Sequence, residues 1–125
     1  MGVLQFDHLV LRVADVERAL DFYTHGLGLP AERVEQWRAG RLPFPSVRVT
    51  DETIIDLVAG QPSAALDHFC LVVEPGDAEA LLANPWLQFT DRTPAERSGA
   101  RGTGMSLYTT DPDGNTIELR WYPGS

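Results

Sequence analysis

Hydrophobic and polar residues alternate along residues 5–13, and this pattern predicts a half-buried strand. Leu9 and Leu11 share one face of that strand, while His8 and Arg12 lie on the opposite face. The first element is therefore expected to bury one side and to present polar chemistry on the other.

A helix is predicted directly after this strand. Asp15 can cap its N-terminus, apolar residues recur at helical spacing for about ten residues, and Gly26 and Gly28 end the pattern. The elements expected next are strands at 31–37, 47–49 and 53–58, with a loop rich in glycine and proline at 38–45. The order of this first half is β-α-β-β-β.

The same order begins again after a short linker at residues 59–65, with a strand at 66–73 and a helix at 77–83. His8 matches His68, 60 residues further on, and Asp56 matches Glu118, 62 residues further on. Repeats of this kind pack against each other to bury a shared face. We therefore expect an α+β fold in one domain, residues 1–125, built from two tandem βαβββ modules (about 4–60 and 65–123). The modules would form a curved mixed sheet around a central cup, with the helices outside.

The closing hairpin, residues 106–121, contains the turn Asp-Pro-Asp-Gly-Asn at 111–115. In its second strand Glu118 lies on a face with Thr116 and Arg120, opposite the apolar residues. A carboxylate is costly to bury without a cationic partner, so either this face is hydrated or Glu118 has such a partner.

The two histidines and two acids occupy equivalent positions of the repeat: His8, His68, Asp56 and Glu118. Two imidazoles with one or two carboxylates can hold a divalent ion of Fe, Mn, Co, Ni or Zn and leave positions open for a substrate. Asp56 is the possible fourth ligand. The alternative is that each histidine is an ordinary surface or hydrogen-bonded side chain.

Other polar residues of the same face are candidates for binding a substrate: Arg12, Arg48 and Tyr108. The two arginines are equally compatible with surface charge or with ion pairs to Asp56 or Glu118. Residues 85–104 are expected to form a loop, whose arginines (Arg92, Arg97 and Arg101) either cover an anionic substrate or are simply solvated.

Charge and composition narrow the class of partner. The chain has 10 basic and 18 acidic residues, a formal net charge of −8, which argues against binding nucleic acid or an anionic membrane. The single Cys70 excludes an internal disulfide, and no signal peptide or membrane-spanning run is visible. A cytoplasmic protein acting on a small molecule is expected.

The chain resembles the vicinal oxygen chelate superfamily in its paired halves, in the Asp-His openings of their first strands and in the run 111–119. That superfamily contains glyoxalase I, type I extradiol dioxygenases and bleomycin-resistance proteins. The run 97–106 resembles the small glyoxalase-domain virulence-protein branch. The resemblance implies metal ligands at His8, His68 and Glu118, and in glyoxalase I a further ligand at the place of Asp56. Arg12 matches an arginine that binds a glutathione carboxylate there, whereas Gly60 replaces the expected asparagine.

Two functions follow from the resemblance. The first is a metal-dependent enzyme that chelates vicinal oxygens of a small substrate, with Glu118 or Asp56 as the base in lyase or isomerase chemistry, or with dioxygenase-type chemistry. The second is a metal-free protein of the bleomycin-resistance type that sequesters a small molecule. A homodimer is expected by the same analogy, with the site completed within one chain or across the dimer.

Overall fold

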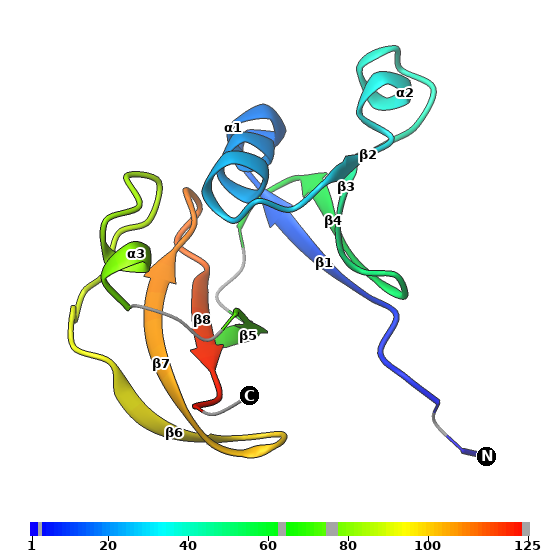
Figure 1. Ribbon diagram of the computed structural model, residues 1–125. Helices are drawn as coiled ribbons and strands as arrows, with labels where there is room; N and C mark the ends of the chain where they lie inside the picture. The colour runs from blue at the N-terminus through cyan, green and yellow to red at the C-terminus, as the bar shows by residue number, and fades with distance from the viewer. Residues whose placement is uncertain (3, 63–64, 75–77, 124–125) are drawn as a thin grey trace. The chain divides into compact units, whose positions relative to one another are not determined.

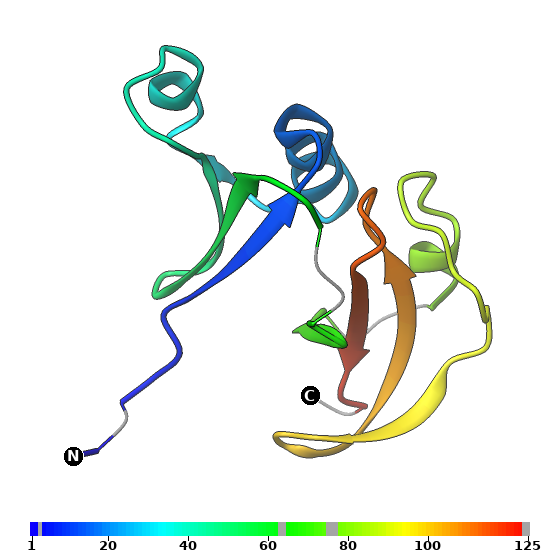
Figure 2. The same ribbon diagram turned by 180° about the vertical axis from the view of Figure 1, so that it is seen from behind.

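The computed structural model describes residues 1–2, 4–62, 65–74 and 78–123. The chain divides into two compact units, residues 1–63 and 64–125. Each unit contains one four-stranded mixed sheet with few, short helices, as Figures 1 and 2 show from opposite sides. The expected α+β fold of two tandem βαβββ modules is confirmed.

The sheet of the first unit has the strand order β1-β4-β3-β2. Its strands are β1 (His8–Val13), β2 (Ala31–Glu32), β3 (Ser46–Thr50) and β4 (Thr53–Ala59). β1 and β4 pair in parallel, whereas the pairs β2–β3 and β3–β4 are antiparallel. The parallel pair places the polar face of β1 next to the strand that carries Asp56.

Helix α1 (Val16–Asp21) follows β1, and one π-helical turn, η1 (Phe22–Gly26), continues it. The predicted cap is confirmed, because the Asp15 carboxylate accepts a hydrogen bond from the backbone N–H of Arg18 at 3.1 Å. The helix contributes buried apolar side chains to the core of the first unit: Val16, Ala19, Leu20, Phe22 and Tyr23. The apolar face of β1 and the helix thus share one core.

The strand predicted at 31–37 is wrong beyond its first two residues. Arg33 has a φ of 64°, a left-handed conformation that ends β2 and turns the chain into helix α2 (Val34–Arg38). Arg38 donates to both carboxylate oxygens of Glu17, at 2.9 and 2.7 Å, and so ties α2 to α1. Alternation of polar and apolar residues over so short a run did not separate strand from helix.

The second unit repeats this topology with the order β5-β8-β7-β6. Its elements are β5 (His68–Val72), α3 (Ala78–Leu82), β6 (Ala95–Gly99), β7 (Gly102–Thr110) and β8 (Thr116–Trp121). The first residue of the predicted helix 77–83 lies outside the described residues, as does part of the predicted linker 59–65. The loop expected at 85–104 is in part wrong, because β6 and the start of β7 form a long antiparallel hairpin there (Figure 1).

The turn between β7 and β8 forms as predicted. The Asp111 carboxylate accepts hydrogen bonds from the backbone N–H groups of Asp113 and Asn115, at 2.9 and 2.8 Å, and from the Asn115 amide at 2.8 Å. Gly114 has a φ of 84°, which favours glycine. This turn fixes the register of the two strands that carry Tyr108 and Glu118.

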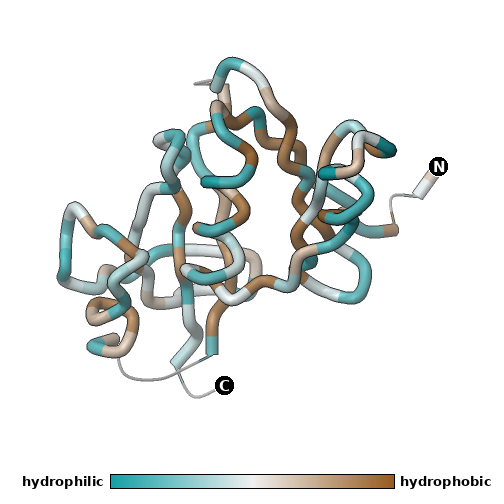
Figure 3. The backbone as a smooth tube through the Cα atoms, turned by 90° about the horizontal axis from the view of Figure 1, so that it is seen from above, coloured by the Kyte–Doolittle hydropathy of each residue, from teal (hydrophilic) through white to brown (hydrophobic). Residues whose placement is uncertain are grey.

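Hydrophobic and hydrophilic residues alternate along much of the backbone (Figure 3), as expected for sheets with one apolar face. In the second unit the core includes Leu107, Ile117 and Leu119, each at most 1% exposed. In the part of the chain that the structure describes, every helix is too short or too polar to cross a membrane.

Candidate metal centre

Each unit opens its first strand with an aspartate that orients a histidine. The Nδ1 atom of His8 lies 2.8 Å from Oδ2 of Asp7, and Nδ1 of His68 lies 2.6 Å from Oδ2 of Asp67. A carboxylate held on Nδ1 keeps the proton there, so Nε2 is the nitrogen available for a ligand. The same arrangement in both units supports the repeat inferred from the sequence.

Each unit also buries an acid against a serine. Ser46 Oγ donates to Oδ1 of Asp56 at 2.6 Å, and Ser106 Oγ donates to Oε2 of Glu118 at 2.6 Å. Asp56 is 6% and Glu118 4% exposed, so these hydroxyls replace water that the carboxylates lose on folding. Neither serine was among the predicted site residues.

The two hairpins differ in register by two residues. Ser46 lies directly opposite Asp56, whereas Ser106 lies opposite Arg120, and Tyr108 takes the place opposite Glu118. Ser106 therefore reaches its acid along a diagonal, a longer span than a direct cross-strand pair. The extra methylene of glutamate compensates for that span, which explains why an aspartate and a glutamate serve equivalent positions.

In the second unit the histidine and the acid meet. Nε2 of His68 lies 3.2 Å from Oε1 of Glu118, between neighbouring parallel strands. The hydrogen bond to Asp67 raises the pKa of His68 above its ordinary value, and the charge of Glu118 acts in the same direction although burial opposes it. A nitrogen and an oxygen donor thus converge on one point.

Arg120 is a cationic partner of Glu118, which was one of the two alternatives that the sequence left open. Its Nη2 donates to Oε2 of Glu118 at 2.8 Å, and Arg120 is only 3% exposed. Burial alone would raise the pKa of Glu118, but the hydrogen bonds from Ser106 and Arg120 outweigh burial and lower it. Arg120 was placed on this face by strand alternation but was not among the predicted site residues; its position two residues after Glu118 was the available signal.

The predicted substrate-binding residues have different surroundings. Tyr108 presents its ring edge to His68, with ring centroids 5.9 Å apart. Arg12 is exposed, with its side chain beside Gly60. Arg48 instead forms a two-pronged ion pair with Glu32, at 2.5 and 2.9 Å, and its partner is neither Asp56 nor Glu118.

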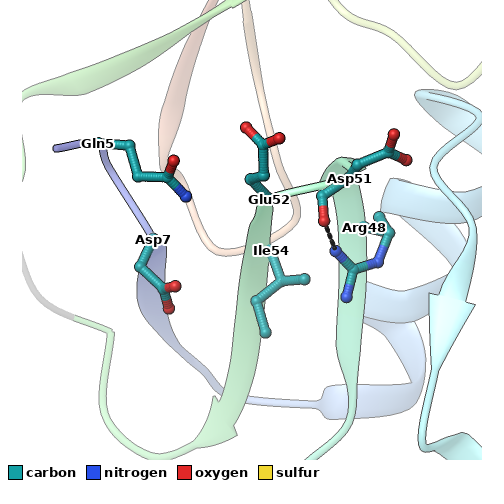
Figure 4. Close-up of a pocket in the computed structure, with 6 residues that line it drawn as sticks. All are labelled: Gln5, Asp7, Arg48, Asp51, Glu52 and Ile54. Carbon is teal, nitrogen blue, oxygen red and sulfur yellow. Dashed lines mark hydrogen bonds between the residues drawn. The ribbon is translucent and has the colours of Figure 1, made fainter.

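A pocket of about 250 Å³ in the first unit is lined by one apolar side chain, Ile54, and by five polar ones (Figure 4): Gln5, Asp7, Arg48, Asp51 and Glu52. Figure 4 shows the guanidinium of Arg48 turned toward the backbone oxygen of Asp51, which accepts its hydrogen bond at 3.0 Å. The three carboxylates point in different directions. The guanidinium of Arg48 already pairs with Glu32 and donates to backbone carbonyls. This pocket is therefore poorly suited to binding an anion.

The predicted ligands are distributed between the units, His8 and Asp56 in the first and His68 and Glu118 in the second. Among the described residues, no three or more His, Cys, Asp or Glu side chains gather in the manner of a metal site. Of the four predicted ligands, His68 and Glu118 are the two that the structure brings into contact within one unit.

The arginines of the segment expected to be a loop are also fixed locally. Arg92 donates to the backbone oxygen of Leu82, and Arg97, on β6, donates to that of Glu96. The guanidinium of Arg101 lies 4.3 Å from the ring centroid of Tyr122. The segment thus forms a hairpin from Ala95 onward, and its three arginines are exposed and held by local contacts.

Comparison with known proteins agrees with this architecture. Residues 5–119 match the model of the glyoxalase/bleomycin resistance protein/dioxygenase superfamily. The virulence protein STM3117 of Salmonella typhimurium is 31% identical, with 98% of this chain and 87% of that protein covered. A lactoylglutathione lyase of Neisseria meningitidis is 28% identical, with 90% and 86% covered.

Solved structures support the same relationship. The crystal structure of STM3117 has a TM-score of 0.73 at 27% identity and covers 98% of this chain and 99% of its own. A glyoxalase/dioxygenase from Nostoc punctiforme has a TM-score of 0.71 at 20% identity, covering 98% of each chain, and shows the shared fold. The chain belongs to the glyoxalase/bleomycin resistance protein/dioxygenase superfamily.

Proposed function

We propose that this protein is an enzyme that uses a divalent metal ion to act on a small substrate with two neighbouring oxygen atoms. His8, His68 and Glu118 would hold the ion, and Asp56 would be a fourth ligand or the catalytic base. The observation that carries the proposal is the pair formed by Nε2 of His68 and Oε1 of Glu118, 3.2 Å apart, each with its other polar atom already occupied.

The donor set fits a divalent ion of the first transition series. Asp7 and Asp67 hold Nδ1 of the two histidines, which leaves both Nε2 atoms for coordination. Ser106 and Arg120 occupy Oε2 of Glu118, which leaves Oε1. Imidazole nitrogens and carboxylate oxygens are ligands for Fe, Mn, Co, Ni and Zn, and the donor set does not choose among them.

A bound ion would supply Lewis acidity toward two oxygens of the substrate. The protein residues would do the remaining work. Asp56 is the better candidate for the base, because Ser46 occupies only its Oδ1 whereas Arg120 stabilises the charged form of Glu118. Tyr108 and Arg12 would contact the substrate, while Arg48 would first have to leave Glu32.

Two reaction classes follow from the family. Similarity to a lactoylglutathione lyase favours lyase or isomerase chemistry, and the family name also includes dioxygenases. The choice depends on Asp56. A carboxylate that accepts a proton suits the lyase class, whereas a site of two histidines and one carboxylate with open positions suits the oxygenase class.

Metal analysis of protein purified without an affinity tag tests this function. Wild type, His8→Ala, His68→Ala and Asp56→Ala would be compared with His25→Ala, which changes an exposed histidine of η1 outside the proposed set. We expect about one ion per site in wild type and His25→Ala, with loss in His8→Ala and His68→Ala. If no ion binds to wild type after reconstitution with each metal, the protein is instead a metal-free small-molecule binder.

Activity assays on the loaded protein then separate the two classes. Lactoylglutathione lyase activity that Asp56→Ala abolishes supports the lyase class with Asp56 as base. Oxygen uptake with a catechol that survives in Asp56→Ala supports the dioxygenase class.

The proposed site would form either within one chain or by exchange across a homodimer. Unfolding and refolding a mixture of His8→Ala and His68→Ala distinguishes these arrangements. In an exchanged dimer, one mixed site combines His8 and His68 from two chains and regains metal binding. If each site forms within one chain, the mixture stays inactive.

A further inference from the structure

We propose that Arg120 is a positioning residue of this metal centre, and that the β6–β7 hairpin acts on metal affinity through it. The inference rests on the proposed function, because it assigns a role beside the ligand Glu118. The residues that carry the inference all lie in the second unit, within the ranges 65–74 and 78–123 that the structure describes.

Arg120 joins Glu118 to the hairpin with a single guanidinium. Nη2 donates to Oε2 of Glu118 at 2.8 Å and to the backbone oxygen of Ser98 at 2.9 Å. Nη1 donates to the backbone oxygens of Arg97 at 2.9 Å and Gly102 at 3.5 Å. The guanidinium is planar and rigid. The three carbonyl oxygens that accept hydrogen bonds from it therefore also fix the direction in which Nη2 donates to Glu118.

Two glycines provide the space that this guanidinium occupies. A Cβ atom on Gly99 would overlap Nη1 of Arg120 and come within 2.9 Å of the Tyr122 hydroxyl. A Cβ atom on Gly104 would lie 3.1 Å from Nη1 and 2.9 Å from the backbone oxygen of Trp121. The backbone of Gly99 is not in the left-handed region, so its lack of a side chain serves packing rather than conformation.

Tyr122, the residue directly after β8, also contacts the Arg120 guanidinium. Its ring centroid lies 5.5 Å from the Arg120 guanidinium carbon and 4.3 Å from that of Arg101. Its hydroxyl accepts a hydrogen bond from the backbone N–H of Arg101 at 3.3 Å. The tip of the hairpin is thereby tied to β8, the strand of the proposed ligand.

The two units differ at the position of Arg120. Val58 stands at the equivalent position of the first unit, and among the described residues Asp56 accepts a hydrogen bond from its serine and none from a guanidinium. The serine–acid pair of the module thus forms in the first unit without an arginine at this position.

These contacts fix the orientation of the Glu118 carboxylate in the proposed site. With Oε2 held by Ser106 and Arg120, the Glu118 carboxylate cannot rotate freely, and Oε1 stays directed at Nε2 of His68. Without Arg120 the carboxylate can turn toward other donors, so its oxygen is less often in place. Loss of such a partner of a metal ligand typically weakens metal affinity 10–100-fold.

Titration with Zn²⁺ against a chromophoric chelator tests the proposal on wild type, Arg120→Met and Gly99→Ala. Gly114→Ala is the control for backbone strain: Gly114 lies in the turn between β7 and β8, has a φ of 84°, and its Cβ would meet no atom within 4 Å. We expect about 10–100-fold weaker Zn²⁺ binding in Arg120→Met and Gly99→Ala, with Gly114→Ala close to wild type. Arg120→Lys should recover only part of the affinity, because an ammonium group cannot reproduce the fork.

Circular dichroism restricts the comparison to folded variants, and Arg120→Lys replaces any variant that does not fold. Zn²⁺ binding by Arg120→Met or Arg120→Lys as tight as wild type, or tighter, overturns this inference and leaves the proposed function standing. Equal weakening in Gly99→Ala and Gly114→Ala would also overturn it, since general strain would then explain the effect. If wild type binds no Zn²⁺ and no other divalent ion, the proposed function and this inference fail together.

Discussion

Removing the Ser106 hydroxyl should destabilise the second unit by an amount that the structure allows us to estimate. Ser106 is 1% exposed and donates to Glu118, which is 4% exposed, at 2.6 Å. A hydrogen bond to a charged group contributes about 1.5–3 kcal/mol. Because Arg120 still holds the same carboxylate oxygen in Ser106→Ala, we expect the lower end, about 1.5 kcal/mol at pH 7.

The effect should depend on pH in one direction. The pKa of Glu118 is below its ordinary value of 4.5 in the folded protein, so its interactions stabilise the fold above that value. This contribution is lost as the pH falls below 4.5 and the carboxyl group becomes protonated. The difference in unfolding free energy between wild type and Ser106→Ala should therefore shrink over the same range.

Urea unfolding followed by tryptophan fluorescence and circular dichroism measures this difference at pH 7 and at several values below 4.5. Ser98→Ala is the matched control, because its side chain is exposed on the neighbouring strand and its backbone oxygen still accepts from Arg120. We expect Ser98→Ala within about 0.5 kcal/mol of wild type. A cost of Ser106→Ala that is equally small at pH 7, or that does not decrease in acid, would refute the reasoning.

Two further predictions concern the same unit. Asp67→Asn should lower the pKa of His68, because the hydrogen bond that His68 donates to the Asp67 carboxylate is the main cause that raises this pKa. An NMR titration of the His68 ring measures the change, and an unchanged titration would contradict the assignment. Leu119→Ala should cost about 2–5 kcal/mol of unfolding free energy in urea, since Leu119 is 1% exposed; a cost below about 1 kcal/mol would show that its site is poorly packed.

The fold was predictable from the sequence wherever a pattern extended over a whole element. The alternation in residues 5–13, the Asp15 cap and the 111–115 turn each depend on local chemistry. Each predicted element forms, although the first strand begins only at His8. The predictions for residues 31–37 and 85–104 were wrong in part, for physical reasons. In the first, the left-handed Arg33 interrupts a short run; in the second, β6 is mostly exposed and lacks an apolar face to mark it.

The candidate site was predictable in its residue types and less so in its contacts. Repeat positions identified His68 and Glu118, which meet in the structure. They could not reveal that Ser106 reaches Glu118 along a diagonal, because register depends on turn length. Arg48 illustrates the same point: it was a candidate for binding a substrate, yet it lies opposite Ile54 and pairs with Glu32.

The two acids of the repeat have therefore diverged in a way that bears on their proposed roles. Both are buried and both accept a hydrogen bond from a serine, so the shared module provides a carboxylate at this position in each unit. Of the two acids, Glu118 alone has a guanidinium partner among the described residues, and this partner favours its charged form and restricts its orientation. A carboxylate that is held in place and favoured in its charged form is suited to holding a cation, and this supports Glu118 as a ligand of the proposed metal centre. In the same proposal Asp56, which is held by Ser46, is the fourth ligand or the base.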